Sequence, residues 1–342
     1  MNKFKLSICI ATFNRATYIG ETLNSILSQL DSNVELIVVD GASPDSTGEV
    51  MRDYANRYPQ VRYFKEQENS GVDRDYDKAV GYASGEYCWL MTDDDLLLPG
   101  SVATVLSKLT GQWDLVVVNS KIKNADLSKT LASRQLDLED DRVYSGNRSE
   151  QFCSDCMRYL SFIGSVVIRR DAWLSRDRVS YYGTLFVHVG VIFQEKALEN
   201  VYVIAAPQIV IRYGNAMWTS KGFEIWMFKW PQLVWSFDRF SDETKKLVCK
   251  KEPYTELREL VLKRAIGVYG LKEYRQFLAG QVFGLAKLQA LGIALTPACF
   301  VNTLASLYCI AFNRKALSGI YDFSRSTNST VISRMVARIM NV

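Results

Sequence analysis

Short apolar runs alternate with segments in which apolar residues recur every three or four positions. Four runs predict buried strands, at residues 5–12, 35–40, 61–64 and 86–91. The segments between them have helical spacing, at residues 16–30, 47–57 and 76–83. Continuous apolar strands suit a parallel sheet that is covered on both faces. The alternation predicts an α/β fold with a doubly wound, mostly parallel, Rossmann-like sheet.

The second half of the chain has a looser pattern. Further strands are expected at residues 113–119 and 164–168, and as a pair at 201–204 and 208–213. From Met217 onward the spacing becomes helical and aromatic. We therefore predict a domain boundary near residue 215, which separates a catalytic domain over 1–215 from a mainly helical region over 216–342.

The uneven distribution of charge along the chain indicates that the two parts have different functions. The chain has 342 residues and a net charge of +4, yet residues 221–342 hold 18 of the 41 Lys+Arg and 9 of the 37 Asp+Glu. That region is thus +9 and the remainder −5. A basic C-terminal part is typical of contact with an anionic membrane surface, and a merely solvated basic face is an equal alternative. Nucleic acid is not expected, since no binding motif is present.

Composition restricts the chemistry further. Hydrophobic residues make up 48% and charged residues 23%, which excludes a disordered or fibrous chain. His188 is the single histidine, so a zinc site with several imidazoles is excluded. Any metal must be held by oxygen ligands, which favours magnesium or manganese. The seven cysteines show no disulfide spacing, and the CxxC pair Cys153 and Cys156 is interpreted as ordinary thiols of a reducing, cytoplasmic compartment.

Polar residues gather where the predicted strands end, which in an α/β sheet is where ligands bind. Thr12 and Asn14 follow the first strand, Asp40 ends the second, and Asp93–Asp95 follow the fourth. Three adjacent carboxylates repel one another, and a divalent cation that holds a diphosphate would relieve the repulsion. The alternative is a solvated turn in which an aspartate caps the next helix.

Four blocks of the sequence resemble the family 2 glycosyltransferases, which have a GT-A-type nucleotide-sugar-binding fold. They are SICIATFNR at 7–15, VVDGASPDST at 38–47, SGVDRDYDKA at 70–79 with ASGEY at 83–87, and TDDDLLLPGS at 92–101. The last block resembles the DxD motif of that family. Their order and spacing make the resemblance specific over residues 5–101.

The resemblance implies roles for individual residues. Nucleotide or donor-sugar contacts are implied for Thr12, Asn14, Arg15, Asp40, Ser43, Gly71, Asp73 and Asp93. Metal ligation of Mn²⁺ or Mg²⁺ is implied for two or three of Asp93, Asp94 and Asp95, with Asp94 also catalytic. Donor-sugar contacts are also plausible for Arg74 and Asp75, and a solvated loop is the alternative for Asp73, Arg74 and Asp75.

The sequence departs from the family at the general base. Inverting members carry a Glu-Asp pair before a helix, whereas this chain has Val187-His188-Val189 at the corresponding place. We expect His188 to act as the base, since its ordinary pKa suits deprotonation of a sugar hydroxyl. A satisfied core histidine is the alternative, and Asp171 and Asp177 are further candidates for the base.

These departures are similar to the abequosyltransferase-like subgroup, which implies a deoxy- or dideoxyhexose donor and a lipid-linked oligosaccharide acceptor in O-antigen assembly. We predict an inverting, metal-dependent glycosyltransferase. The alternative is a non-catalytic nucleotide-sugar- or glycan-binding module. A nucleotidyltransferase is disfavoured because Thr12-Phe13-Asn14-Arg15 lacks a glycine-rich phosphate loop.

The C-terminal region has a long uncharged stretch over residues 288–313, interrupted by Pro297. Two short helices broken at Thr296-Pro297 are expected rather than one spanning helix. They would pack on the catalytic domain or lie peripherally on the inner face of the bacterial cell membrane. Four tryptophans form either a sugar-stacking platform or ordinary core: Trp218, Trp226, Trp230 and Trp235. An oligomer is possible.

Overall fold

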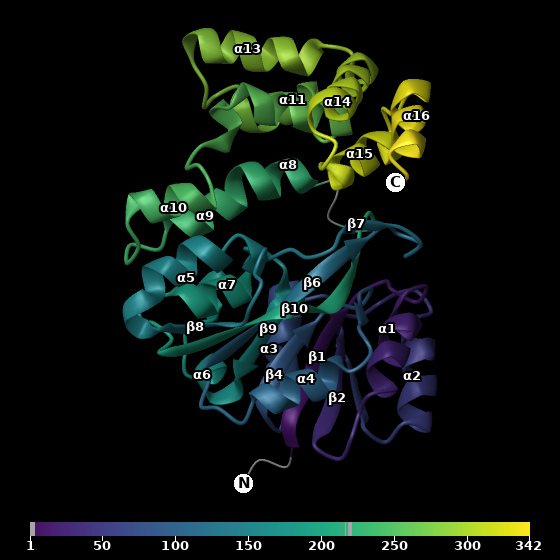
Figure 1. Cartoon of the computed structure of the whole chain (residues 1–342), viewed down its shortest axis with the longest axis vertical. Helices are drawn as coiled ribbons and strands as arrows, with labels where there is room; N and C mark the ends of the chain where they lie inside the picture. Colours follow the sequence, from purple (N-terminus) through teal and green to yellow (C-terminus); the bar gives the residue numbers. More distant parts are fainter. Residues whose placement is uncertain (1–3, 216, 218–220) are drawn as a thin grey trace. The chain divides into compact units, whose positions relative to one another are not determined.

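The computed structural model describes residues 4–215, 217 and 221–342 and contains two compact units, coloured along the chain in Figure 1. Unit 1 comprises Met1–Lys121, Arg134–Ile211 and Phe237–Val248. Unit 2 comprises Ile122–Ser133, Arg212–Ser236 and Cys249–Val342. The chain therefore passes between the two units more than once.

Unit 1 is built on a twisted mixed sheet with the strand order β3-β2-β1-β4-β9-β6-β10-β5. The parallel half consists of β1 (Phe4–Thr12), β2 (Val34–Asp40), β3 (Val61–Lys65) and β4 (Gly85–Met91). The remaining strands are β5 (Leu96–Leu97), β6 (Leu115–Lys123), β8 (Arg142–Ser145), β9 (Val166–Arg169) and β10 (Asn200–Arg212). This mostly parallel α/β sheet confirms the predicted fold class.

Helices cover the sheet, and this explains the continuous apolar strands. Every residue of β2 is buried, because helices pack on both faces of the parallel half. Ile19, Leu23 and Ile26 of α1 recur at helical spacing and join the same core. The helices of unit 1 are α1 (Ile19–Leu27), α2 (Thr47–Arg57), α3 (Val72–Tyr82), α4 (Ser101–Lys108), α5 (Ser149–Cys156), α6 (Arg170–Leu174), α7 (Val187–Phe193) and α10 (Asp242–Val248).

One prediction about the sheet is wrong. The two strands expected at 201–204 and 208–213 form the single strand β10. Its first residues, 200–203, pair with β8, and Ile209 and Val210 pair with β5. Pro207, which has no N–H to donate, lies between these two paired stretches.

Unit 2 is mainly helical and contains one short strand, β7 (Thr130–Ala132). Its helices are α8 (Gly222–Glu224), α9 (Trp230–Trp235), α11 (Leu257–Ile266), α12 (Leu271–Glu273), α13 (Gly284–Leu295), α14 (Ala298–Phe312), α15 (Leu317–Arg325) and α16 (Val331–Ile339). π-helical turns at Ile225–Lys229 and Tyr274–Leu278 follow α8 and α12. Phe223 and Tyr269 anchor one core, and Ile320 and Phe323 anchor another.

The uncharged stretch forms two helices, as predicted. Helices α13 and α14 meet at a bend of 96° at Thr296-Pro297. Thr296 has extended backbone angles, which the following proline favours. Among the described residues, no helix alone has the length and apolar composition needed to cross a membrane, and only this bent pair meets that test together.

The tryptophan cluster is partly core. Trp230 is buried and its ring lies 6.1 Å from that of Trp226, which packs against the Phe223 core. Trp235 is half-buried. Trp218 lies outside the described residues.

Candidate active site

Three strand ends bring the predicted polar residues to one edge of the sheet of unit 1. Thr12 at the end of β1 pairs in register with Asp40 at the end of β2. Ile10 pairs with Met91, so the Thr92–Asp95 turn follows directly at the end of β4. Parallel pairing therefore gathers side chains that lie up to 83 positions apart in sequence.

Arg15 joins this edge to the aspartate turn through two ion pairs. Its Nε lies 3.3 Å from Asp93 Oδ1, and a terminal guanidinium nitrogen lies 3.3 Å from Asp94 Oδ2. All three side chains are largely buried, with 10–13% of their side-chain surface exposed. The structure thus brings Asp93 and Asp94 together around one cation, a contact that the sequence analysis did not foresee for Arg15.

The carboxylate pair carries an electrostatic strain. Burial, and next the negative charge of Asp94, raise the pKa of Asp93 to about 7, although Arg15 and the Thr12 hydroxyl oppose the shift. After burial itself, Asp93, Asp94 and Asp95 raise the pKa of Tyr76, whose hydroxyl donates to the carbonyl of Met91 at 3.0 Å. Additional positive charge would therefore be stabilising at this turn.

Asp95 has a different environment from its two neighbours. Its Oδ2 accepts a hydrogen bond from the hydroxyl of Thr92, and its side chain is buried. Within the described part of the chain, no three His, Cys, Asp or Glu side chains form a group that could hold a metal ion. Asp93 and Asp94 offer two carboxylates, whose oxygens fit a hard cation such as Mg²⁺ or Mn²⁺ that completes its shell with water or phosphate oxygens.

Asp40 fixes the turn that follows β2. Its Oδ1 accepts from the backbone N–H of Ser43 at 2.8 Å, and its Oδ2 accepts from the hydroxyl of Tyr63 at 2.7 Å. Asp40 is 0% exposed. Ala42, inside the turn, has a φ of 64°, a strained value for a residue other than glycine. The carboxylate therefore stabilises the shape of the 40–43 turn.

Ser43 and Thr47 in turn hold the loop after β1. The backbone N–H of Asn14 donates to Ser43 Oγ at 2.9 Å, and that of Arg15 donates to Thr47 Oγ1 at 2.9 Å. Asn14 itself has a φ of 57°. Both side chains thus fix the backbone at the base of the Arg15 side chain.

Asp73 is a long-range anchor in this structure. Its Oδ2 accepts from the backbone N–H groups of Gly183 and Leu185 at 2.8 and 2.9 Å, and its Oδ1 accepts from that of Val187 at 3.0 Å. Leu185 has a φ of 72°, and Gly183 has a φ of 85°. Asp73 therefore holds a strained turn at the start of α7, and both of its oxygens are used in doing so.

The rest of the 71–77 block supports the same segment. Gly71, with a φ of 90°, caps the start of α3, and its carbonyl accepts from the backbone N–H of Asp75. The carboxylate of Asp77 accepts hydrogen bonds from the indole N–H of Trp173 at 2.8 Å and from the hydroxyl of Tyr182. It also forms an ion pair with the guanidinium of Arg178. These are inward-facing structural contacts, so the solvated-loop alternative does not describe Asp73 or Asp77.

His188 lies in the core at the start of α7. It is 1% exposed, and its Nε2 lies 2.8 Å from the carbonyl oxygen of Leu160. Burial lowers its pKa to about 4 despite hydrogen bonds with Leu160 and Ser161. The ring is therefore neutral at neutral pH and a weaker base than an exposed histidine. Its Nδ1 is buried and has no hydrogen-bond partner among the described residues, so the ring is not fully satisfied. The role of His188 as the base stays a prediction, and the burial of the ring speaks against it.

The other sequence candidates lie at the surface or act as ordinary side chains. Asp171 is exposed in the first turn of α6, and Asp177 accepts from the backbone N–H of Ser180 at 3.2 Å. Cys153 and Cys156 are buried in α5, and burial raises the pKa of each thiol to about 12. Such thiols are protonated and inert at neutral pH.

Sequence reasoning missed the partners that shape the site. The hydroxyl of Tyr63 bonds to Asp40, which lies 23 positions earlier in the chain. The backbone of the Gly183–Val187 turn bonds to Asp73, which lies up to 114 positions earlier. The one local signal was Gly183, whose flexibility suits a turn before a helix.

Comparisons with known proteins show the family of the chain. The family model of glycosyl transferase family 2 matches residues 7–168. Abequosyltransferase RfbV of Salmonella typhimurium is 30% identical over 230 residues, which cover 64% of this chain and 69% of that protein. The GalNAc(5)-diNAcBac-PP-undecaprenol beta-1,3-glucosyltransferase of Campylobacter jejuni is 31% identical over 135 residues, 39% of this chain and 44% of its own length.

Solved structures share the fold. The mannosyltransferase PcManGT from Pyrobaculum calidifontis, in complex with GDP-Man and Mn²⁺, superposes with a TM-score of 0.52. The match covers 94% of this chain and 87% of that one at 14% sequence identity. At this identity the similarity concerns the fold alone.

Proposed function

Since the chain belongs to glycosyl transferase family 2 and is a glycosyltransferase, we propose that it transfers the sugar of a nucleotide-sugar to an acceptor hydroxyl with inversion of configuration. The donor sugar is a deoxy- or dideoxyhexose, in keeping with the similarity to an abequosyltransferase. The acceptor is a lipid-linked oligosaccharide of O-antigen or another cell-surface polysaccharide, in keeping with the acceptor that the Campylobacter relative's name states.

One observation carries this proposal: Asp93 and Asp94 at the carboxyl end of β4 share Arg15 in a largely buried cluster. Transfer breaks the bond between the sugar and the diphosphate, and negative charge grows on the leaving group. Preorganised charged groups in a partly dry site stabilise such charge best. Arg15 supplies a fixed cation at this place, and its backbone is held by Thr47.

A divalent cation, Mn²⁺ or Mg²⁺, fits the Asp93 and Asp94 oxygens and would supply further stabilisation of the leaving diphosphate. A Mn²⁺ complex of a protein with the same fold supports this assignment. Asp95, bonded to Thr92, holds the turn in shape.

The nucleotide is proposed to bind beside the turns after β1 and β2. Asp40 and Ser43 fix the shape of these turns. Thr12, Asn14 and Arg15, at the carboxyl end of β1, are proposed to contact the nucleotide. Asp73 keeps the Gly183–Val187 turn in place, and Gly71 starts the helix that carries Asp73. In this proposal Asp73 is a positioning residue for the donor side of the site.

Unit 2 and the basic region over 216–342 are proposed to serve the acceptor and to associate peripherally with the inner face of the bacterial cell membrane. Apolar side chains are exposed along α13, α14 and α16, which is typical of helices that lie in an interface. The excess of Lys and Arg in this region suits an anionic leaflet.

Calorimetry tests the proposal most directly. A panel of nucleotide-sugars is titrated with and without Mn²⁺ into the wild type, into Asp94→Asn and into Asp53→Asn, whose exposed side chain serves as control. We expect one donor to bind in a metal-dependent way, with affinity lost in Asp94→Asn and kept in Asp53→Asn. Mass spectrometry of an added lipid-linked acceptor then detects the transferred sugar.

Two outcomes would overturn the proposal. Equal donor binding by Asp94→Asn and the wild type would remove the cluster from the site. Metal-dependent donor binding without any sugar transfer to an acceptor would leave a binding module in place of the proposed transferase.

A further inference from the structure

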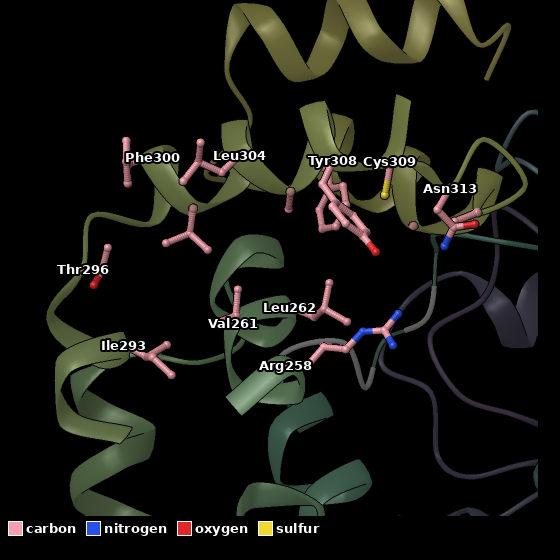
Figure 2. A pocket seen from close by; sticks show the side chains of 15 residues that line it. Arg258, Val261, Leu262, Ile293, Thr296, Phe300, Leu304, Tyr308, Cys309 and Asn313 are labelled. Carbon is pink, nitrogen blue, oxygen red and sulfur yellow. The ribbon is translucent and has the colours of Figure 1, made fainter. Parts of the chain in front are cut away.

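Unit 2 contains a long apolar groove between α11 and α14. Figure 2 shows Val261 and Leu262 of α11 facing Leu304 and Tyr308 of α14 across it. Its volume is about 630 Å³, within the range of sites for small ligands. Ile293, Thr296 and Phe300 line one end. The lining is almost entirely carbon, so the groove suits an apolar chain.

One charged side chain lines this groove. Figure 2 shows Arg258 of α11 with its guanidinium on the Asn313 side of Leu262. In the described part of the chain, no carboxylate lies within ion-pair distance of Arg258, and its side chain has no hydrogen-bond partner. Arg314 and Lys315 directly follow Asn313 and are exposed. Arg258 is itself exposed, so its guanidinium is accessible to an anionic group at this end of the apolar groove.

The groove continues into an exposed apolar stripe. Phe300, Leu304, Tyr308 and Phe312 recur every four residues along α14 and are each more than half exposed. Polar Asn302 and Ser306 are turned inward, where Asn302 Nδ2 donates to the carbonyls of Ala265 and Phe323. The helix therefore presents large apolar residues outward in addition to Val301 and Cys309, which it buries in the core, whereas a surface helix in water usually has a polar outer face.

We propose that this groove binds the isoprenoid chain of a polyprenyl-diphosphate-linked acceptor, with Arg258 contacting the diphosphate. The proposal rests on the proposed function, from which it takes a lipid-linked acceptor. A long apolar chain that ends in a strongly anionic group matches both features of the groove: its carbon lining and its single cation. The Campylobacter relative's name states a PP-undecaprenol acceptor, which has this chemistry.

Vesicle binding of the full chain tests the proposal without relying on activity. Three vesicles are compared: neutral phosphatidylcholine, the same with a few per cent polyprenyl diphosphate, and the same with an anionic diacyl phospholipid at matched total charge. The readout is the ratio of affinities for the second and third vesicles. We expect this ratio to exceed one in the wild type.

Two groove variants and two matched controls sharpen the readout. Arg258→Gln should lower the ratio about fivefold and Leu304→Gln about tenfold, because each removes one recognised feature. Arg57→Gln and Val179→Gln change exposed residues of unit 1 that do not line the groove, and they should leave the ratio unchanged. The altered positions are exposed, and thermal melts confirm that all variants are folded.

Three results would overturn the proposal. A wild-type ratio of one would mean that the groove takes an acyl chain or that only charge is recognised. Groove variants with a wild-type ratio would place the lipid elsewhere. Self-association of the wild type that Leu304→Gln abolishes in sedimentation would mean that a second copy covers the groove.

This test is separate from that of the proposed function. Donor binding at the Asp93–Asp94 cluster is measured by calorimetry without any lipid. If donor binding fails while the vesicle ratio behaves as expected, the transfer reaction is refuted and the groove is retained. The reverse result refutes the groove alone.

Discussion

The two units treat charge and apolar surface in opposite ways. Of the 21 large apolar side chains exposed in the described part of the chain, 16 belong to unit 2 and only five to unit 1. Conversely, Arg212 is the one Asp, Glu, Lys or Arg of unit 2 that is buried among the described residues, whereas unit 1 buries eight. Unit 1 thus keeps charge inside and compensates it with fixed partners, as a catalytic site requires. Unit 2 exposes apolar side chains that only a membrane, an apolar ligand or another protein could bury.

The largest expected effect comes from breaking the charge compensation of unit 1. Arg15→Gln leaves Asp93 and Asp94 without their shared cation, and we expect a loss of about 3 kcal/mol of unfolding free energy at neutral pH. Chemical denaturation measures it. Arg57→Gln, which removes an exposed pair with Asp53, should cost less than about 0.5 kcal/mol. Equal losses in the two variants would contradict the special status of the buried cluster.

Removal of the Asp73 anchor ranks next. Asp73→Ala deprives three backbone N–H groups of their acceptor, and we expect a loss of about 2–3 kcal/mol. Hydrogen exchange at Leu185 and Val187 should accelerate while exchange in β1 and β2 changes little. Asp73→Asn keeps one carbonyl oxygen and should fall between the wild type and Asp73→Ala. Unchanged exchange at residues 183–187 would show that the anchor does not hold the turn.

Acid should weaken unit 1 through His188. The folded pKa of about 4 lies below the ordinary 6.5, so the unfolded chain binds the proton more tightly. Stability is then full above pH 6.5 and falls as pH drops toward 4, by up to about 3 kcal/mol. His188→Gln should remove this part of the pH dependence, and turnover of its folded form should stay within about fivefold. Abolished turnover with intact donor binding would establish His188 as the base.

Unit 2 should respond to acid in the opposite direction, through a pKa shift slightly smaller than that of His188. Burial raises the pKa of Asp322 to about 6, although Tyr213 donates to its Oδ2 at 2.8 Å. The folded state therefore binds the proton more tightly, and this contribution to stability grows as pH falls from 6 toward the ordinary value of 3.8. Asp322→Asn removes a buried charge while its amide oxygen can still accept from Tyr213, so it should not lower stability at neutral pH, and it should abolish the gain in acid. If the stability of Asp322→Asn still rises in acid, another group causes that rise.

The sequence was most informative where the fold itself is most regular. The runs around Ile8, Ile37 and Trp89 predict buried strands because parallel strands covered on both faces need apolar residues at every position. The polar residues at their ends, Asp40 and Asp93, follow from the same logic. The break at Pro297 is equally local, since proline limits the residue before it.

What the sequence could not predict depends on partners distant along the chain. A lone histidine in an apolar stretch has the same local pattern whether its ring faces a cavity or a carbonyl, so the contact of His188 with Leu160 was out of reach. The roles of Asp73 and Arg15 likewise depend on which backbone groups and carboxylates the fold brings to them. The resemblance of the 70–79 block indicated that Asp73 lies near the donor site, but it did not predict the three backbone N–H groups that donate to its carboxylate.

The turn at Leu185 has a consequence for the order of folding. Its left-handed backbone is unfavourable by itself and is held by a carboxylate 112 positions earlier in the chain. Closing so long a loop costs entropy before any bond is gained, so the turn should form only after α3 has docked on the sheet. We therefore expect Asp73→Asn to speed unfolding while hardly slowing folding, as stopped-flow kinetics can measure. The start of α7 would then be a late-forming part of unit 1.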